Sequence, residues 1–313
     1  MNEISNLIAD RLPKSKGVVM KSYKLAPISW LKVGGPAEFF FKPNDFHDLQ
    51  HFLTNLDRSI PVFFIGACSN LLIRDGGIPG VCIKLGKNFG KIEFGNDTIT
   101  VGASMPAPKV AILASNKGLD LTFLRTIPGT VGGVVKMNAG CYGRYVSDYL
   151  ESVNVIERNG RISKLTKEDL KFNYRSSSLQ SNCVVTSATF RSDKKAPEVL
   201  KSEMDEAVNY RASIQPTSEL SCGSAFKNPS GFSSTGKNDK DTKYSAWKLI
   251  DDAGLRGITL GKAKVSEKHP NFLINMGGAS ASDLEDLGEK IRKTVLNLYG
   301  VQLDWEIKVV GKR

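Results

Sequence analysis

The 313-residue sequence has little of what metal sites, membrane spans and secretion signals require. It contains three histidines and five cysteines, and no two cysteines have C-x-x-C spacing, so we expect no metal site. A scattered, odd set of cysteines is typical of reduced thiols in a cytosolic protein. No apolar run is long enough to cross a bilayer, and residues 1–20 lack the apolar core of a signal peptide. We therefore expect a cytoplasmic protein that does not contact membranes.

The common nucleotide-binding motifs are also missing. Neither G-x-G-x-x-G nor G-x-x-x-x-G-K-[ST] occurs in the sequence. Instead, two turns rich in small residues occupy 65–70 and 127–133. Such turns can point successive backbone N–H groups at one anion. Gly132-Gly133 is expected to open a short helix, whose dipole would also favour an anion. The residues alone leave two interpretations open, anion binding and plain connecting turns.

The net charge of +11 suits either a polyanion or a pocket for phosphates and carboxylates. A nucleic-acid-binding protein is expected to show a dense Lys/Arg stripe interleaved with aromatic residues. Here the basic residues are spread evenly among acidic ones. We therefore expect no nucleic-acid partner, and the sign of the charge alone does not identify another ligand.

The length predicts two or three domains, and the hydrophobic pattern predicts an α+β protein with many short strands and no internal repeat. Two strands hinged at Gly34–Pro36 are expected within 28–42, and an alternating strand over 303–309. Asn44 is expected to cap the first helix. The polar stretch 231–244 predicts a disordered surface loop ahead of a separate C-terminal region. The other expected helices span 108–117, 197–211, 245–253 and 282–299.

Seven segments, in order, resemble the signature blocks of the UDP-N-acetylenolpyruvoylglucosamine reductase family, in its shorter variant. They run from about residue 29 to the C-terminus, and they read WLKVGGPAEFF, IGACSNLLIRDGGIPG, LRTIPGTVGGVVKMNAGCYG, YRSSSL, SCGSAFKNP, VSEKHPNFLIN and LDWEIKVVG. The resemblance implies an FAD-binding module of two α+β subdomains, like that of the vanillyl-alcohol-oxidase group, and a smaller substrate-binding domain. The expected boundaries are 1–85, 86–195 and 196–313.

The resemblance implies that NADPH reduces a bound FAD, which then reduces the enolpyruvyl ether of UDP-N-acetylglucosamine to UDP-N-acetylmuramate, a precursor of peptidoglycan. It assigns Ser224 as the proton donor, Arg175 as the group that stabilises the enolate, and Glu306 as the carboxylate that completes the catalytic set. Without the resemblance each residue has a plainer interpretation, as a turn serine, a surface arginine and a solvated strand glutamate.

The resemblance also implies two sets of binding residues. The residues expected at FAD are Ile65, Gly66, Ala67, Cys68, Ser69, Asn70, Ile127, Pro128, Gly129, Thr130, Gly132, Gly133, Asn138, Gly140, Arg211 and Gly223. The residues expected at the nucleotide-sugar substrate are Gln215, Lys227, Asn228, Lys264 and His269.

One alternative is a vanillyl-alcohol-oxidase-type flavoprotein that oxidises a small alcohol or sugar. Many members of that group attach FAD through a histidine in the first glycine turn, and GACSN has none. We therefore expect FAD to be bound non-covalently, and we expect a monomer. Cys68 and Cys141 depart from the usual pattern, and each thiol either contacts the flavin or packs in the core.

Overall fold

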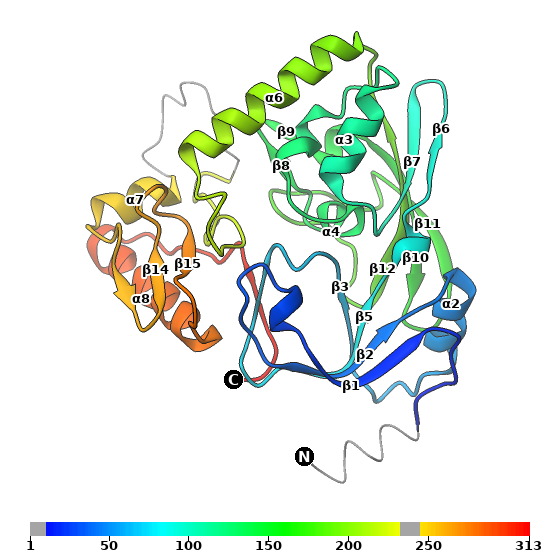
Figure 1. Ribbon diagram of the computed structural model, residues 1–313, viewed down its shortest axis with the longest axis horizontal. Helices are drawn as coiled ribbons and strands as arrows, with labels where there is room; N and C mark the ends of the chain where they lie inside the picture. The colour runs from blue at the N-terminus through cyan, green and yellow to red at the C-terminus, as the bar shows by residue number, and fades with distance from the viewer. Residues whose placement is uncertain (1–10, 232–244) are drawn as a thin grey trace.

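The computed structural model describes residues 11–231 and 245–313. Two sheets lie one above the other, and the C-terminal helices and small strands gather at one side of them (Figure 1). The polar stretch expected to be a disordered loop lies outside the described residues, apart from Gly231.

The first sheet has the strand order β1-β2-β5-β3. Strand β1 (Val18–Lys24) is antiparallel to β2, whereas β2 (Pro36–Lys42), β5 (Ile78–Lys84) and β3 (Val62–Ile65) are mutually parallel. Helix α2 (Phe46–Asn55) packs on this sheet, and the rings of Phe41 and Phe52 stack at 3.9 Å. Because the three parallel strands point the same way, their carboxyl ends share one edge, where ligands of open parallel sheets commonly bind.

Two local predictions in this region are wrong. Residues 28–42 contain one strand, β2, because the chain before it forms a 3-10 helix (Ala26–Ile28) and then turns. Pro27 suits the first turn of a helix, and Lys32 and Gly34 have φ values of 55° and 112°, which a strand does not allow. The cap of α2 is Asp45 and not Asn44, since the Asp45 carboxylate accepts from the Asp48 amide at 2.9 Å.

The second sheet is antiparallel throughout, in the order β11-β10-β12-β7-β6. Its strands are β6 (Ile92–Phe94), β7 (Thr98–Gly102), β10 (Leu150–Glu157), β11 (Ile162–Thr166) and β12 (Cys183–Arg191). Its core also takes in helical residues from α3 (Ala107–Ser115), the 3-10 helix η3 (Thr122–Thr126), α4 (Val131–Lys136) and α5 (Val146–Tyr149). A short hairpin, β8 (Gly140–Cys141) and β9 (Arg144–Tyr145), and the 3-10 helix Lys87–Phe89 complete this part.

Helix α6 (Pro197–Ile214) belongs with the second sheet by its packing. Its buried Met204 is part of the same core as Phe123 and Phe190, and the helix runs across this subdomain toward the C-terminal part (Figure 1). The sequence-based boundary at 196 assigned this helix to the C-terminal domain. We propose that the boundary lies after Ile214 instead.

The C-terminal part combines a three-stranded antiparallel sheet with two helices. It contains α7 (Ala246–Asp252), β13 (Thr259–Leu260), β14 (Ala263–Val265), β15 (Leu273–Asn275) and α8 (Ala281–Tyr299). The last strand, β16 (Lys308–Val310), leaves this domain and pairs in parallel with β4 (Leu71–Ile73) of the first subdomain. The expected strand over 303–309 is therefore only three residues long, although Leu303 and Ile307 are buried as its alternation predicted.

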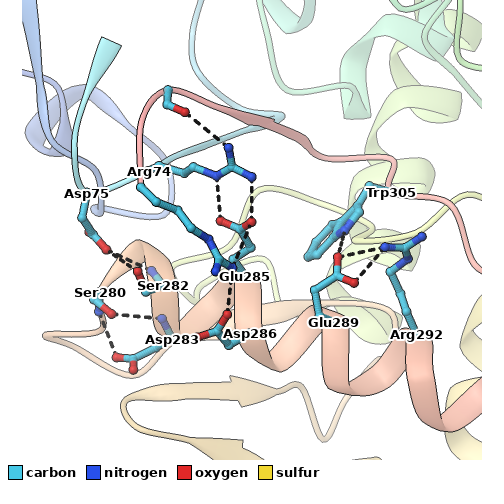
Figure 2. A network of polar contacts seen from close by, with 12 residues as sticks. Arg74, Asp75, Ser280, Ser282, Asp283, Glu285, Asp286, Glu289, Arg292 and Trp305 are labelled. Carbon is cyan, nitrogen blue, oxygen red and sulfur yellow. Dashed lines mark hydrogen bonds and ion pairs between the residues drawn. The ribbon is translucent and has the colours of Figure 1, made fainter. Parts of the chain in front are cut away.

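Charged groups fasten α8 to the turn after β4 (Figure 2). Arg74 donates from Nε and Nη2 to both carboxylate oxygens of Glu285, at 2.9 and 2.8 Å. Asp75 accepts from the amides of Ala281 and Ser282, at 2.9 and 3.0 Å, and so caps α8 from another part of the chain. The C-terminal domain is thus tied to the first subdomain by directed ion pairs as well as by β16.

Candidate active site and cofactor cavity

The two glycine turns contact each other. Ser69 Oγ donates to the Pro128 carbonyl at 3.0 Å. Gly66 faces Thr130 so closely that a Cβ on Gly66 would lie 2.6 Å from Thr130 Oγ1, so a larger residue would have to displace that hydroxyl. Gly129 has a φ of 141°, which favours glycine. The turns therefore form one continuous rim between the two subdomains.

The expected helix after the second turn is α4, which begins at Val131, one residue before the predicted start at Gly132. The amides of Val131 and Gly132 donate to the carbonyls of Met105 and Ala103, both at 2.9 Å. These two N–H groups hold the turn in place and are not available to an anion. The helix dipole thus contributes less to anion binding than the sequence suggested.

A cavity of about 730 Å³ opens beside the rim, at the carboxyl ends of β2, β5 and β3. Five of the residues expected at FAD line it: Ile65, Gly66, Thr130, Gly132 and Gly133. Five lysines line it as well, Lys42, Lys84, Lys87, Lys109 and Lys136, and the lining that the structure describes includes no Asp or Glu. A cavity of this charge favours an anionic ligand, and the diphosphate of FAD meets that requirement.

A second group of residues lies where three segments meet, around an ion pair between Arg175 and Glu306. Arg175 Nε is 2.6 Å from Glu306 Oε1, and each side chain is only 14% exposed. Arg175 Nη2 donates to the Gly140 carbonyl at 3.1 Å, and the guanidinium lies over the ring of Tyr174 at 5.0 Å. In the described structure Arg175 Nη1 is buried without a hydrogen-bond partner. A buried unpaired donor is rare, and here it suits an anionic ligand.

The backbone around Glu306 is held from two sides. The Glu306 amide donates to the Ala225 carbonyl at 2.8 Å, and Asn70 Nδ2 of the first glycine turn donates to the Glu306 carbonyl at 3.1 Å. Ser224 immediately precedes Ala225 and pairs with Phe272 on its other side. Within the described residues the Ser224 hydroxyl has no hydrogen-bond partner, so it is free to donate to a ligand.

Burial raises the pKa of the Glu306 carboxyl, while Arg175, Lys227 and Lys308 oppose that rise. Burial, the largest single cause, would lower the pKa of Arg175, but Glu306, Tyr174 and Tyr145 together outweigh it, so the pKa lies above its ordinary value. The solvated glutamate expected from strand statistics is therefore wrong, because Glu306 turns inward to a buried cation. Arg175 also adopts a left-handed φ of 54°, which costs energy in a residue other than glycine.

Two regions of the chain match known protein families. Residues 37–166 match a family described as an FAD binding domain, and residues 215–310 match the C-terminal domain of UDP-N-acetylenolpyruvoylglucosamine reductase. The reductase of that name from Cereibacter sphaeroides is 50% identical over 301 residues, which cover 96% of this chain and 98% of the relative. The chain belongs to the UDP-N-acetylenolpyruvoylglucosamine reductase family.

Other reductases of the family are similarly related to this chain. The relative from Paracoccus denitrificans is also 50% identical over 301 residues. The crystal structure of the enzyme from Thermus caldophilus superposes with a TM-score of 0.78 at 31% identity, over 95% of this chain and 99% of that one. The predicted family, the α+β fold with an FAD-binding module, the FAD cofactor and the oxidoreductase class are confirmed. The alternative of an alcohol or sugar oxidase is not favoured.

Several residues that the family resemblance assigns to FAD serve the protein's own structure. Asn138 is buried, donates to the Asn173 carbonyl at 3.1 Å and accepts from the Ser147 amide at 2.9 Å, so it fixes the loop that carries Arg175. Cys68 and Ile127 are buried in the cores of the two subdomains. Gly223, with φ of 89°, has open space at its Cβ position.

Cys141 and Arg211 lie close together. The Cys141 sulfur is 3.2 Å from both Thr126 Oγ1 and the Phe123 carbonyl, and burial raises the pKa of its thiol. Burial lowers the pKa of Arg211, and Arg211 Nε is buried without a partner in the described structure. Arg211 is therefore a second arginine with a buried nitrogen that lacks a partner in the described structure, and it is a candidate ligand-binding residue.

The residues assigned to the substrate differ in their surroundings. Lys227 acts electrostatically on Glu306, whereas Asn228 Oδ1 accepts from the Ala246 amide at 3.2 Å. Lys264 forms an ion pair with Glu267 at 2.5 Å, and His269 packs on Phe272 with ring centroids 4.9 Å apart. Gln215 follows the last residue of α6.

Within residues 11–231 and 245–313, which the structure describes, every helix is too short or too polar to span a bilayer. Among the same residues, no group of three or more His, Cys, Asp or Glu side chains is arranged to hold a metal ion.

Proposed function

We propose that Arg175, Ser224 and Glu306 perform the chemistry of this enzyme. As a member of its family, the chain is an FAD-dependent oxidoreductase that uses NADPH to reduce UDP-N-acetylglucosamine enolpyruvate to UDP-N-acetylmuramate in peptidoglycan precursor synthesis. The observation that carries the proposed residue roles is the buried Arg175–Glu306 pair with its unpartnered guanidinium nitrogen.

Arg175 suits the carboxylate of the enolpyruvyl group. Negative charge grows on that carboxylate as hydride arrives, and bound FAD supplies the hydride. A fixed guanidinium donor placed before the reaction stabilises such charge without reorganisation, and it does so most strongly where water is excluded. Glu306 and Gly140 occupy two nitrogens of the fork, which leaves Nη1 without a protein partner in the described structure and able to donate to a ligand.

Ser224 suits the proton transfer that follows. A serine hydroxyl is a weak acid, so it needs neighbours that take up the charge it leaves behind. Glu306 lies on the adjoining segment, and its raised pKa means that it holds a proton more readily than an exposed glutamate does. Together the two groups provide a donor and a route for its reprotonation.

The replacement Ser224→Ala tests these roles by separating the half-reactions. Reduction of the bound flavin by NADPH should keep its rate. Reoxidation by the enolpyruvyl nucleotide should slow by about 10²–10⁴-fold, the usual contribution of a positioned acid. Anaerobic stopped-flow absorbance of the flavin measures both steps. Ser202→Ala, which removes an exposed hydroxyl on α6, serves as the matched control.

Equal slowing of both half-reactions would assign Ser224 to cofactor binding. Unchanged rates in both would remove it from the mechanism. Neither result affects the family assignment, because wild-type turnover tests that separately.

We further propose that FAD is held non-covalently and that the enzyme works as a cytoplasmic monomer without nucleic-acid or membrane partners. All five cysteines lie in the described residues and are free, as a reducing compartment favours. Release of FAD on denaturation and sedimentation equilibrium of the holoenzyme test the first two points.

A further inference from the structure

Two lysines end neighbouring parallel strands at the edge where the cavity opens. Strand β2 ends at Lys42 and β5 ends at Lys84. Phe41 pairs with Ile83 in the parallel register, so the next residue of each strand is a lysine and the two lie side by side. Lys84 also pairs with Ile65, the last residue of β3, from which the first glycine turn starts.

Lys84 reaches directly under that turn. Its ammonium donates a hydrogen bond to the Gly66 carbonyl, and both residues line the cavity. Burial lowers the pKa of Lys84, the neighbouring thiols of Cys68 and Cys82 oppose the shift, and Lys42 adds to it. Gly66 in turn faces Thr130 of the second turn. The Lys84 charge therefore lies at the junction of the two turns.

Lys42 approaches the same place from the neighbouring strand. Its stem passes over Gly86, where a Cβ would lie 2.9 Å from Lys42 Cε. Its side chain lines the cavity, although the residue as a whole is exposed. Two cations thus share one edge and repel each other.

Among the residues that the structure describes, neither lysine has an acidic partner. In the described part of the chain no ion pair includes Lys42 or Lys84, and no carboxylate lines the cavity beside them. Partly burying a cation without a counter-charge is unfavourable, so adjacent cations at a ligand cavity indicate an anion that neutralises them when bound.

We infer that Lys42 and Lys84 form a two-lysine site for the diphosphate of FAD, at the carboxyl ends of β2 and β5. The diphosphate carries the cofactor's negative charges, and the glycine turns bring backbone to the same place. Lys84 has two functions there, since it fixes the Gly66 carbonyl and supplies charge. The inference rests on the FAD cofactor and not on the roles proposed for Arg175, Ser224 and Glu306.

The test measures how tightly the holoenzyme keeps its FAD. On dilution, released flavin becomes fluorescent, and this gives the dissociation constant. Lys84→Met should weaken FAD by about 10- to 100-fold, as expected for a charge-assisted hydrogen bond, and Lys42→Met by about 3- to 10-fold because Lys42 is exposed. Lys164→Met, which removes a charge from the exposed strand β11, should leave the constant unchanged.

The salt dependence of FAD binding distinguishes the charge of the two lysines from structural support of the glycine turn by Lys84. Raising NaCl from about 50 mM to about 500 mM should weaken FAD binding in the wild type more steeply than in Lys84→Met or Lys42→Met, because the variants have less charge to screen. Lys84→Arg should restore most of the affinity and the salt slope.

An unchanged FAD dissociation constant in both methionine variants overturns the inference. A loss in Lys84→Met alone, with the wild-type salt slope, also overturns it and leaves Lys84 as a support of the turn. NADPH is the other phosphate-bearing ligand, and a weakened NADPH dissociation constant with normal FAD retention would assign the lysines to the hydride donor instead.

Discussion

His269 accepts a hydrogen bond from the Asn271 amide at 3.3 Å through Nδ1 and packs on Phe272. Burial lowers the pKa of its imidazole from 6.5 to about 4. The unfolded chain therefore takes up a proton near pH 6.5, whereas the folded protein resists protonation until about pH 4. The stability from this residue is complete above pH 6.5 and is lost as the pH falls through that window.

The predicted loss is up to about 3 kcal/mol between pH 6.5 and pH 4, before solvent screening reduces it. Urea unfolding of wild type and His269→Gln at several pH values measures it. The glutamine cannot titrate, so its free energy of unfolding should decline less over this range. If the free energies of unfolding of the two proteins changed equally with pH, the lowered pKa of His269 would be contradicted.

Gly288 of α8 lies against Trp305, which precedes Glu306 in the chain. A Cβ on Gly288 would lie 2.0 Å from Trp305 Cη2, and Trp305 Nε1 donates to Glu289 at 2.8 Å (Figure 2). Gly288→Ala must displace the indole, so we expect a loss of about 1–3 kcal/mol in stability even though alanine favours helices. Urea unfolding checks this.

Lys293→Ala on the exposed side of α8 is the matched control and should change stability by less than about 0.5 kcal/mol. We also expect Gly288→Ala to slow reoxidation of the reduced flavin, because the segment that carries Glu306 moves with the ring. A stable, fully active Gly288→Ala variant would show that the indole is free to shift.

The residues proposed to be catalytic show how much of the site can be predicted from residue patterns. Arg175 and Glu306 are 131 positions apart, and alternation places Glu306 only on the face opposite Leu303 and Ile307. Whether that face meets solvent or a buried cation depends on a loop elsewhere in the chain. Reasoning from the residues alone favoured solvent and was wrong. The family resemblance assigned both residues to one catalytic set but did not predict that they form an ion pair.

At the scale of elements, α8 receives two caps at its N-terminus. The Ser280 side chain accepts from the Asp283 amide. Asp75, on the other side of the domain junction, accepts from the amides of Ala281 and Ser282. Asp75→Ala should cost about 1–2 kcal/mol, from the lost cap and the lost charge near the helix dipole. Ser280→Ala removes the local cap alone and should cost about 1 kcal/mol.

Urea unfolding of both variants and of the double variant measures these costs. Because Asp75 also ties α8 to the turn after β4, we expect its loss to be the larger of the two. If Ser280→Ala costs as much as Asp75→Ala, the tie across the junction contributes nothing beyond capping.

The helices were the most predictable elements. The apolar stripe of α8 and the glycine that ends it, Gly300 with φ of 66°, define the helix locally, and the structure begins it at Ala281, one residue before the predicted start. The strand expected over 303–309 failed because its pairing partner decides its length. Strand β4 offers only three residues, 71–73, so pairing is confined to 308–310.

The whole molecule depends on contacts that join distant parts of the chain. The C-terminal strand β16 pairs with β4. Asn70, which immediately precedes β4, bonds the C-terminal segment twice. Its carbonyl accepts from the Lys308 amide at 3.0 Å, and its side-chain Nδ2 donates to the Glu306 carbonyl at 3.1 Å. The first glycine turn therefore connects the lysine-lined cavity to the segment proposed to be catalytic. No local pattern predicts this connection, because the two segments lie at opposite ends of the sequence.

The position of the cavity between the two sheets predicts that FAD stabilises the folded protein as a whole. A ligand that binds only the native state adds about 2.7 kcal/mol when its free concentration is 100 times its dissociation constant. Scanning calorimetry should therefore show a higher Tm for the holoenzyme, rising further with added FAD. Riboflavin, which lacks the diphosphate, is the matched control and should raise Tm far less. The Lys84→Met variant should need correspondingly more FAD to reach the wild-type Tm. If apo and holo forms unfold at one temperature, the cavity closes without its ligand, and the two subdomains are held together by their protein contacts alone.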